Sequence, residues 1–370
     1  MDKLPIDLIQ YCIFDKLDFV TQIRFRQICK RLNRIDIHNM YYHVNYLHKL
    51  SNNILTNYQN LRYLDLHSSI SVTNINHMTN LQILDASRKS GINDDGIKNL
   101  NLIKLNASFN SKLTNINHMI CLRILNACGE NCGIDNNSIK DLNLFQLHAS
   151  HNSKIKNVNH MTNLQILNAS YNCGIDDNGI KDLNLIELNA NNNPKITNVT
   201  HMTNLKILDA SGYNCGIDDN GIKNLNLIEL YASDNPKIKN INHMTNLQIL
   251  DVSWRCGIDN NSIKNLNLIE LNASWNINII NVNHMTNLQI LYASENCGID
   301  DNGIRCLNLI ELNASNNLKI TNVNHMTNLQ ILCASGYSGI GDNGIKNIKL
   351  IKLYAPDNPR ISNNLMMIKN

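Results

Sequence analysis

Apolar residues recur at fixed intervals from about residue 56 to the end of this chain. The segments that start at Leu164 and Leu185 both carry Leu, Leu, Ala, Asn and Ile at offsets one, four, six, nine and twelve. Apolar side chains two or three positions apart fit a short strand and its entry. A period of this size indicates one supersecondary unit that stacks on copies of itself. Fifteen units begin at Leu61, Leu81, Leu102, Leu122, Leu144, Leu164, Leu185, Leu205, Leu227, Leu247, Leu268, Leu288, Leu309, Leu329 and Leu350.

The units have 20 to 22 residues and are of two alternating types. After the strand, one type continues as Gly-Ile-Asp-Asp-Asn-Gly-Ile-Lys, which predicts a short helical turn behind an Asp or Asn cap. The other type continues as Pro-Lys-Ile-Thr-Asn-Val-Asn-His-Met, and its β-branched residues and asparagines favour an extended or 3₁₀ path.

This spacing resembles the pattern L-x-x-L-x-L-x-x-N/C-x-L of the leucine-rich-repeat family, with Ala in place of Leu at offset six. The resemblance implies an α/β repeat solenoid, a horseshoe whose concave side is a parallel sheet of about fifteen repeats. We expect the Asn at offset nine to satisfy backbone groups of the neighbouring coil, which forms an amide ladder. Its predicted members are Asn110, Asn152, Asn172, Asn193, Asn235, Asn276 and Asn317.

Histidine and cysteine also recur in register. Copies in alternate repeats should lie about 9 to 10 Å apart, which is too far for a disulfide or for sharing one zinc ion. We therefore expect no metal and no cofactor, and instead buried thiols, buried Met side chains and His rings that bond a neighbouring coil. The histidines are His77, His118, His160, His201, His243, His284 and His325, and the cysteines are Cys132, Cys173, Cys215, Cys256 and Cys297.

The sequence argues against an enzyme. Cys173 to Asp176 resembles the Cys-x-x-Asp of bacterial leucine-rich-repeat ubiquitin ligases, but the motif occurs five times, whereas a nucleophile needs one singular activated environment. There is no Gly-rich phosphate loop, no singular Cys-His or Ser-His-Asp set, and no segment outside the repeats large enough for a catalytic domain.

Composition and charge limit the expected partners and the expected location of the protein in the cell. The formal net charge is +3 over 370 residues and no basic tract is present, so neither nucleic acid nor a membrane is an expected partner. Asparagine makes up close to a fifth of the chain, but the regular Leu and Ile spacing argues against disorder. The first residues lack an apolar signal segment and no 18 apolar residues run together. We expect an intracellular, cytoplasmic protein that is a monomer outside its complexes.

The residue type at two offsets, five and eight, varies between otherwise similar repeats. Offset eight follows the strand and offset five faces outward on it, so both should lie along one edge of the concave sheet. Exposed aromatic residues on a rigid surface are typical anchors of protein recognition, although the two tryptophans could simply cover a sheet edge. The predicted partner-binding residues are Arg88, Phe109, Tyr171, Tyr213, Tyr231, Trp254, Trp275, Tyr292 and Tyr337.

Offset three alternates between an aliphatic and an acidic residue. The sequence assigns no role to the striped face that results. Its aliphatic members include Ile83, Ile166 and Ile249, and its acidic members include Glu187, Glu229 and Glu270.

The first forty residues depart from the repeat pattern and show apolar residues at helical spacing, with Pro5 in the opening turn. This segment resembles an F-box, although Phe14 replaces an aliphatic residue and Leu32 stands where an aromatic often follows Cys-Lys. A generic helical cap for the first repeat remains the alternative. The matching residues are Leu4, Pro5, Asp7, Leu8, Ile9, Ile13, Leu17, Ile28, Cys29 and Lys30.

The resemblance implies a substrate receptor of a Skp–cullin–F-box ubiquitin ligase. Residues 1–40 would form the F-box-like module, 41–60 a linker or N-terminal cap, and 61–370 the repeat array that holds a target protein. A leucine-rich-repeat scaffold with a helical cap and no ubiquitin role stays open. The asparagine-rich repeats also resemble those of giant DNA viruses such as mimivirus, or of amoebae. The adaptor contact implied by the family comprises Leu4, Pro5, Leu8, Ile9, Ile13 and Leu17.

Overall fold

The computed structural model describes residues 21–22, 39–40 and 50–362. The chain divides into two compact units, residues 1–183 and 184–370. The implied adaptor residues between Leu4 and Leu17 lie outside the described residues. Helix α3 (Asn52–Leu55) falls within the segment expected to be a linker or cap.

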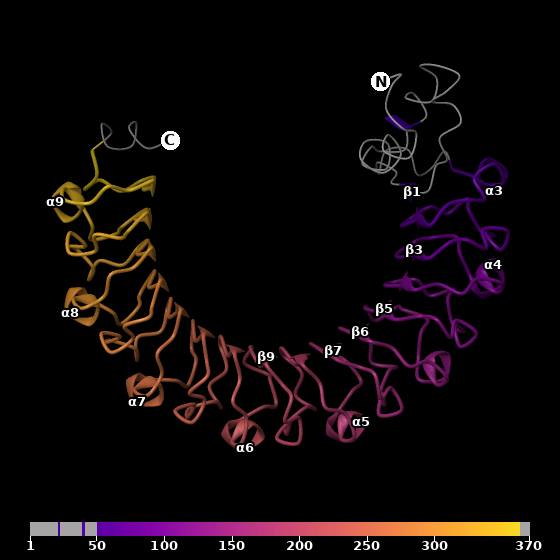
Figure 1. Ribbon diagram of the computed structural model, residues 1–370, viewed down its shortest axis with the longest axis horizontal. Coiled ribbons are helices and arrows are strands. Elements are labelled where there is room, and N and C mark those ends of the chain that lie inside the picture. Colours follow the sequence, from indigo (N-terminus) through magenta and orange to yellow (C-terminus); the bar gives the residue numbers. More distant parts are fainter. Residues whose placement is uncertain (1–20, 23–38, 41–49, 363–370) are drawn as a thin grey trace, which may run out of the picture. The chain divides into compact units, whose positions relative to one another are not determined.

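Each repeat contributes one short parallel strand (Figure 1). Within each unit the strands pair in chain order, so that Leu64 lies beside Leu84 and Leu84 beside Leu105. The first unit contains β1 (Asn39–Met40), β2 (Tyr63–Asp65), β3 (Ile83–Asp85), β4 (Lys104–Asn106), β5 (Ile124–Asn126), β6 (Gln146–His148) and β7 (Ile166–Asn168). The second contains β8 (Glu187–Asn189), β9 (Ile207–Asp209), β10 (Glu229–Tyr231), β11 (Ile249–Asp251), β12 (Glu270–Asn272), β13 (Ile290–Tyr292), β14 (Glu311–Asn313), β15 (Ile331–Cys333) and β16 (Lys352–Tyr354).

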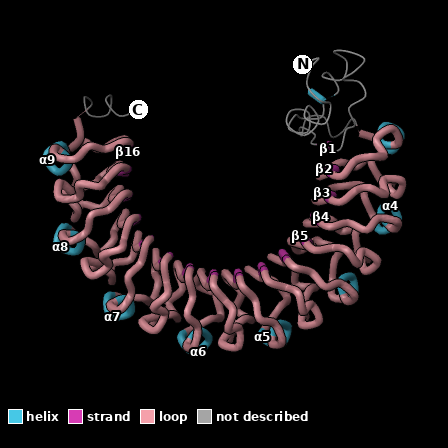
Figure 2. Tube along the Cα trace, viewed as in Figure 1, coloured by secondary structure: helices cyan, strands magenta, loops and turns pink. Residues whose placement is uncertain are grey.

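Short helices lie opposite the strands in every second repeat (Figure 2). As predicted, most of them follow an Asp or Asn cap; Asp176 Oδ1, for example, accepts a hydrogen bond from the Gly179 amide at 2.9 Å. The exception is α9, which follows Gly341. Repeats of the other type contain turns in place of a helix. The helices are α4 (Asp94–Ile97), η4 (Asn137–Ile139), α5 (Asp177–Ile180), α6 (Asp219–Ile222), α7 (Asn260–Ile263), α8 (Asp301–Ile304) and α9 (Asp342–Ile345).

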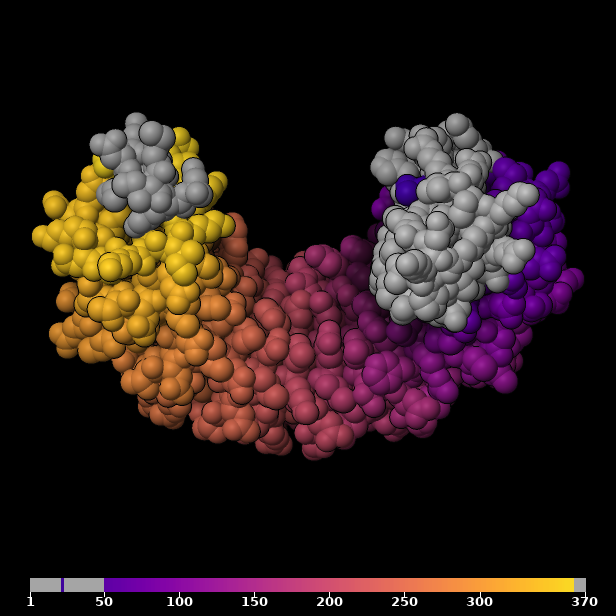
Figure 3. Space-filling model, turned by 45° about the horizontal axis from the view of Figure 1, so that its top comes forward, coloured from indigo at the N-terminus to yellow at the C-terminus, as the bar shows by residue number. Residues whose placement is uncertain are grey.

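The predicted apolar spine is confirmed. The side chains at offsets one, four and six, such as Leu185, Leu188 and Ala190, are fully buried, and so is Met202 of the His-Met pairs. In each of β2–β15 except β4, the central leucine is buried and its two neighbours are partly exposed, which follows from the alternation of side chains along a strand. Successive coils of each unit lie against one another in the space-filling view (Figure 3).

The offset-nine asparagines form the predicted ladder between coils. Asn152 is fully buried, and its Nδ2 donates to the carbonyls of Ala127 at 2.8 Å and Ile134 at 3.0 Å in the preceding repeat. Its Oδ1 accepts from the Lys154 amide at 3.0 Å, as Asn235 Oδ1 does from the Lys237 amide at 2.9 Å. Each side chain thus satisfies three backbone groups that a turn would otherwise leave unpaired.

One predicted ladder member is wrong: Asn172 is exposed. In its repeat type the inward position falls at the following cysteine, here Cys173, because the turn is longer than in the asparagine type. Cys132 and Cys215 show the substitution directly, since their Sγ atoms lie 3.4 and 3.6 Å from the carbonyls of Ala107 and Ala190. The ladder therefore alternates between asparagine and cysteine, with buried Ser90 and Ser338 at the cysteine position of two repeats.

The repeated histidines bond the neighbouring coil, as predicted. His284 Nε2 lies 3.0 Å from the Ile263 carbonyl and His118 Nε2 lies 3.2 Å from that of Ile97. A carbonyl oxygen accepts only, so Nε2 carries the proton in these contacts. Within the described residues, no three His, Cys, Asp or Glu side chains gather as a metal site would require. None of the helices described has the length and apolar character needed to cross a bilayer.

The ladder makes a prediction about stability. Asn152→Ala should lower the free energy of unfolding by about 3 kcal/mol, because three buried backbone groups lose their partner. Asn172→Ala, at the same sequence offset in the next repeat but exposed, should change it by less than about 0.5 kcal/mol. Urea unfolding followed by circular dichroism measures both, and equal losses would contradict the ladder.

Candidate protein-recognition surface

Every offset-eight residue has a left-handed backbone. All fifteen have positive φ, and we call them the left-handed column; Trp254 is at +63° and Trp275 at +62°. Here the chain turns away from the strand while its amide still pairs with the next coil, as between Trp254 N and Ser274 O at 2.9 Å. A non-glycine residue in this conformation costs about 1–2 kcal/mol, and bulky residues are rare there. Gly129, Gly212 and Gly336 occupy it without that cost.

The column nevertheless carries large exposed side chains. Phe109 and Trp254 are 52% and 54% exposed, and Tyr171 and Trp275 are about 40% exposed. The strand spacing brings neighbours into stacking contact: the rings of Trp254 and Trp275 lie 5.1 Å apart at 12°. His151 and Tyr171 stack in the same way, with centroids 4.4 Å apart. Backbone strain kept at exposed aromatic positions favours a functional role over a purely structural one.

In the second unit the stacked tryptophans border a hollow of about 460 Å³. Ile277, 64% exposed, and Arg255 also line it. An aromatic pair beside an exposed aliphatic and a cation has the composition of a protein-binding pocket. Sequence reasoning missed Ile277 because it lies beyond the strand and its flanking columns.

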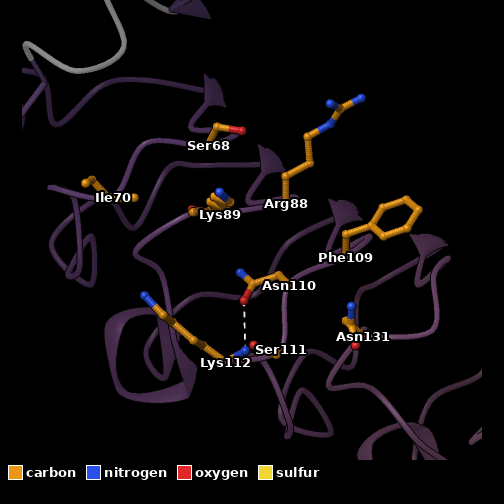
Figure 4. A pocket seen from close by; sticks show the side chains of 10 residues that line it. Ser68, Ile70, Arg88, Lys89, Phe109, Asn110, Ser111, Lys112 and Asn131 are labelled. Atoms are coloured by element: carbon orange, nitrogen blue, oxygen red, sulfur yellow. Dashed lines mark hydrogen bonds between the residues drawn. The ribbon is translucent and has the colours of Figure 1, made fainter.

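In the first unit Arg88 and Phe109 border a hollow of about 790 Å³ (Figure 4). Lys89 and Lys112 add two further cations to its rim. In Figure 4 the Arg88 guanidinium points away from the Lys112 ammonium, so the two do not converge on one anion. This rim presents an aromatic ring and several separate positive charges.

Two of the predicted partner-binding residues are strand ends. Tyr231 and Tyr292 face outward at offset five and are partly exposed. Burial raises the pKa of Tyr231 to about 12, aided by the hydrogen bond that its hydroxyl donates to Glu229 at 3.0 Å. Burial and the charges of Glu311 and Glu270 also raise the pKa of Tyr292. Both phenols are therefore neutral donors.

Tyr213 and Tyr337 occupy a different position from the one expected. In these longer units the left-handed residue is Gly212 or Gly336, so each tyrosine follows the column by one residue. Both are well exposed, at 65% and 75%. The sequence signal that could have placed them is the glycine itself, which is the residue that a positive φ favours.

Comparison with protein families gives a match for the N-terminal segment. The F-box domain model matches residues 1–41. This agrees with the resemblance seen in Leu4, Pro5, Leu8 and Ile9. No curated protein matches the chain.

One solved structure shows the same fold, and two others align less closely. The mouse RP105/MD-1 complex aligns with a TM-score of 0.53 and 15% identity over 88% of this chain and 68% of that one. The TLR13–ssRNA13 complex aligns at 0.47 and 16% over 81% of this chain, which spans about half (51%) of that protein. The yeast Rad7–Elc1 complex aligns at 0.40 and 15% over 93% and 89%. At such identities the likeness concerns the fold alone.

The chain is a leucine-rich-repeat solenoid with an F-box at its N-terminus. That combination supports a protein-interaction adaptor. The candidate surface for it on the repeats comprises the left-handed column and the strand ends.

Burial predicts which thiols react. It raises the pKa of Cys132, Cys215 and Cys297 to about 11 and that of Cys256 to about 12, so each stays a protonated, inaccessible thiol at pH 8. The exposed Cys121 and Cys306 should be alkylated by iodoacetamide within minutes at that pH. Site-resolved mass spectrometry measures both sets. Labelling of the ladder thiols at the rate of the exposed ones, without denaturant, would refute their burial.

The left-handed column predicts that the fold tolerates glycine in place of its large side chains. Trp254→Gly/Trp275→Gly should leave the free energy of unfolding within about 1 kcal/mol of the parent, because relief of backbone strain offsets the lost ring stack. Tryptophans that served mainly as structural cover would instead cost about 3 kcal/mol or more. Urea titration distinguishes the two results.

Proposed function

We propose that this protein is a non-catalytic substrate receptor of a Skp–cullin–F-box ubiquitin ligase. The observation that carries the proposal is the pairing of an F-box match at residues 1–41 with exposed aromatic residues held in a strained backbone on the repeats. Aromatic anchors on a rigid surface are what target recognition requires, because little conformational entropy is lost when they bind.

The two ends of the proposal use different physics. The F-box-like segment that contains Leu8 and Ile9 would pack on a Skp-type adaptor through its apolar side chains, with no bond made or broken. The repeats would hold the target near a conjugating enzyme, so the contribution to ubiquitin transfer is proximity. The proposal includes a cytoplasmic site of action, which for a viral protein would be the cytoplasm of the host.

Adaptor capture tests the first part. The purified full chain should bind a Skp-type adaptor, and Leu8→Asp/Ile9→Asp should weaken that binding about 100-fold or more by placing two charges in an apolar contact. Trp254→Gly/Trp275→Gly serves as the matched control and should bind the adaptor like the parent. In affinity purification the roles should reverse: the glycine variant loses the target and the aspartate variant keeps it.

The outcomes separate the alternatives. Absence of adaptor binding by the unaltered chain would contradict the receptor proposal and favour a repeat scaffold with a helical cap. Retention of the target by the glycine variant would place recognition on another surface.

A further inference from the structure

The outward face of β8–β15 in the second unit is acidic, whereas the last strand, β16, carries Lys352. We call the outward side chains at offsets three and five of β8–β15 the acidic sheet face. Across these strands it contains no Lys, Arg or His. Its acidic members are Glu187, Asp209, Glu229, Asp251, Glu270 and Glu311.

The scaffold does not require this charge. The equivalent positions of β2–β7 in the first unit include Lys104 and His148 and only two acids, Asp65 and Asp85. Both of those acids are engaged locally, Asp65 with His67 at 2.7 Å and Asp85 with Asn106 at 2.8 Å. Asp209 and Asp251 of the second unit are engaged in the same way, by Asn189 at 2.9 Å and Asn272 at 3.1 Å, so the glutamates are what distinguishes the second unit. The same fold therefore forms with or without an acidic face, so the charge serves something other than stacking.

No cationic side chain of the described residues pairs with the three glutamates that lie on alternate strands of this face. Glu229, Glu270 and Glu311 are partly exposed, and none of the three forms an ion pair with a described residue. Burial raises the pKa of Glu270, and the charges of Glu311, Glu229 and Asp251 raise it further. Like charges held on a rigid sheet repel one another, and a bound cation relieves that repulsion.

Aromatic rings lie among these carboxylates. Tyr231 follows Glu229 on β10, and Tyr292 of β13 lies in register between Asn272 and Asn313, on the strands that carry Glu270 and Glu311. A guanidinium can stack on a tyrosine ring while it pairs bidentately with a carboxylate. The face combines both groups that recognise arginine.

We propose that the acidic sheet face of the second unit binds an extended, arginine- or lysine-containing segment of the target protein. This inference rests on the proposed function and names the chemistry of its target. The net negative charge of this face defines the occupant: a cationic peptide complements it, and an acidic or neutral one does not.

The spacing specifies the segment further. Glu229, Glu270 and Glu311 lie on every second strand, which places them about 9–10 Å apart. An extended peptide that crosses the strands advances about 3.3 Å per residue, so about three residues span that distance. A cation at every third position would meet each glutamate in turn.

A peptide probe tests the proposal on the full chain. A fluorescent peptide of about 15 residues with Arg at every third position and Ser and Gly between should bind, as measured by anisotropy, and the binding should weaken as salt is raised. The same peptide with Glu in place of Arg, and one with all the Arg residues contiguous, should bind about tenfold less tightly or worse. Equal affinity for the Arg and Glu peptides would overturn the proposal.

Charge-matched variants locate the site. Glu229→Gln/Glu270→Gln/Glu311→Gln should weaken binding about tenfold or more. The control, Asp219→Asn/Asp301→Asn/Asp342→Asn, removes the same charge from partly exposed acids on the helical side. It is conservative because Asn260 naturally fills that position and accepts from the Ile280 amide at 2.9 Å. Equal weakening by both variants would indicate general attraction and refute the site.

The test is separable from that of the proposed function. A target that is lost in Trp254→Gly/Trp275→Gly but retained at full affinity in the triple glutamine variant would overturn the cationic-segment inference and leave target recognition by the repeats intact. Loss of the same target in both variants supports it.

Discussion

The fold depends on supplying hydrogen-bond partners to backbone groups that lie between coils. Each repeat turns sharply after only three strand residues, so most of its backbone cannot be paired within a sheet. The ladder of buried Asn and Cys side chains meets that demand on the inside. Partly exposed asparagines meet it on the helical side, where Asn283 donates to the Asn302 carbonyl and accepts from the Cys306 amide. The high asparagine content thus has a structural use.

The same turns also carry the exposed side chains of the candidate recognition surface. The chain reaches the ladder only by passing through a left-handed residue, so every repeat offers one position whose backbone is prescribed and whose side chain points outward. Glycine or asparagine would relieve the strain. The presence of Phe109, Tyr171, Trp254 and Trp275 there, at the cost of strain, supports the proposed role of these side chains in recognition.

The outward positions of the strands can also vary in sequence without disturbing the fold. Because the central leucine of each strand supplies the burial, its two neighbours can change charge without disturbing the stack. The first unit uses these positions for a mixed set and the second for an acidic one, in which Glu270 feels Glu311 and Glu229. Near-identical coils can thereby present two different surfaces to partners.

The sequence by itself determined the repeat, its offsets and its core. Periodic burial leaves a direct trace, so Leu185, Leu188 and Ala190 could be placed inward, and the capped helical turns and His contacts followed from the same register. Asn172 was misplaced because equal sequence offset does not mean equal depth when one turn is longer. Only the tertiary structure decided that the variable column is left-handed and that Trp254 stacks on Trp275. These properties arise from the spacing between coils, which no single repeat contains.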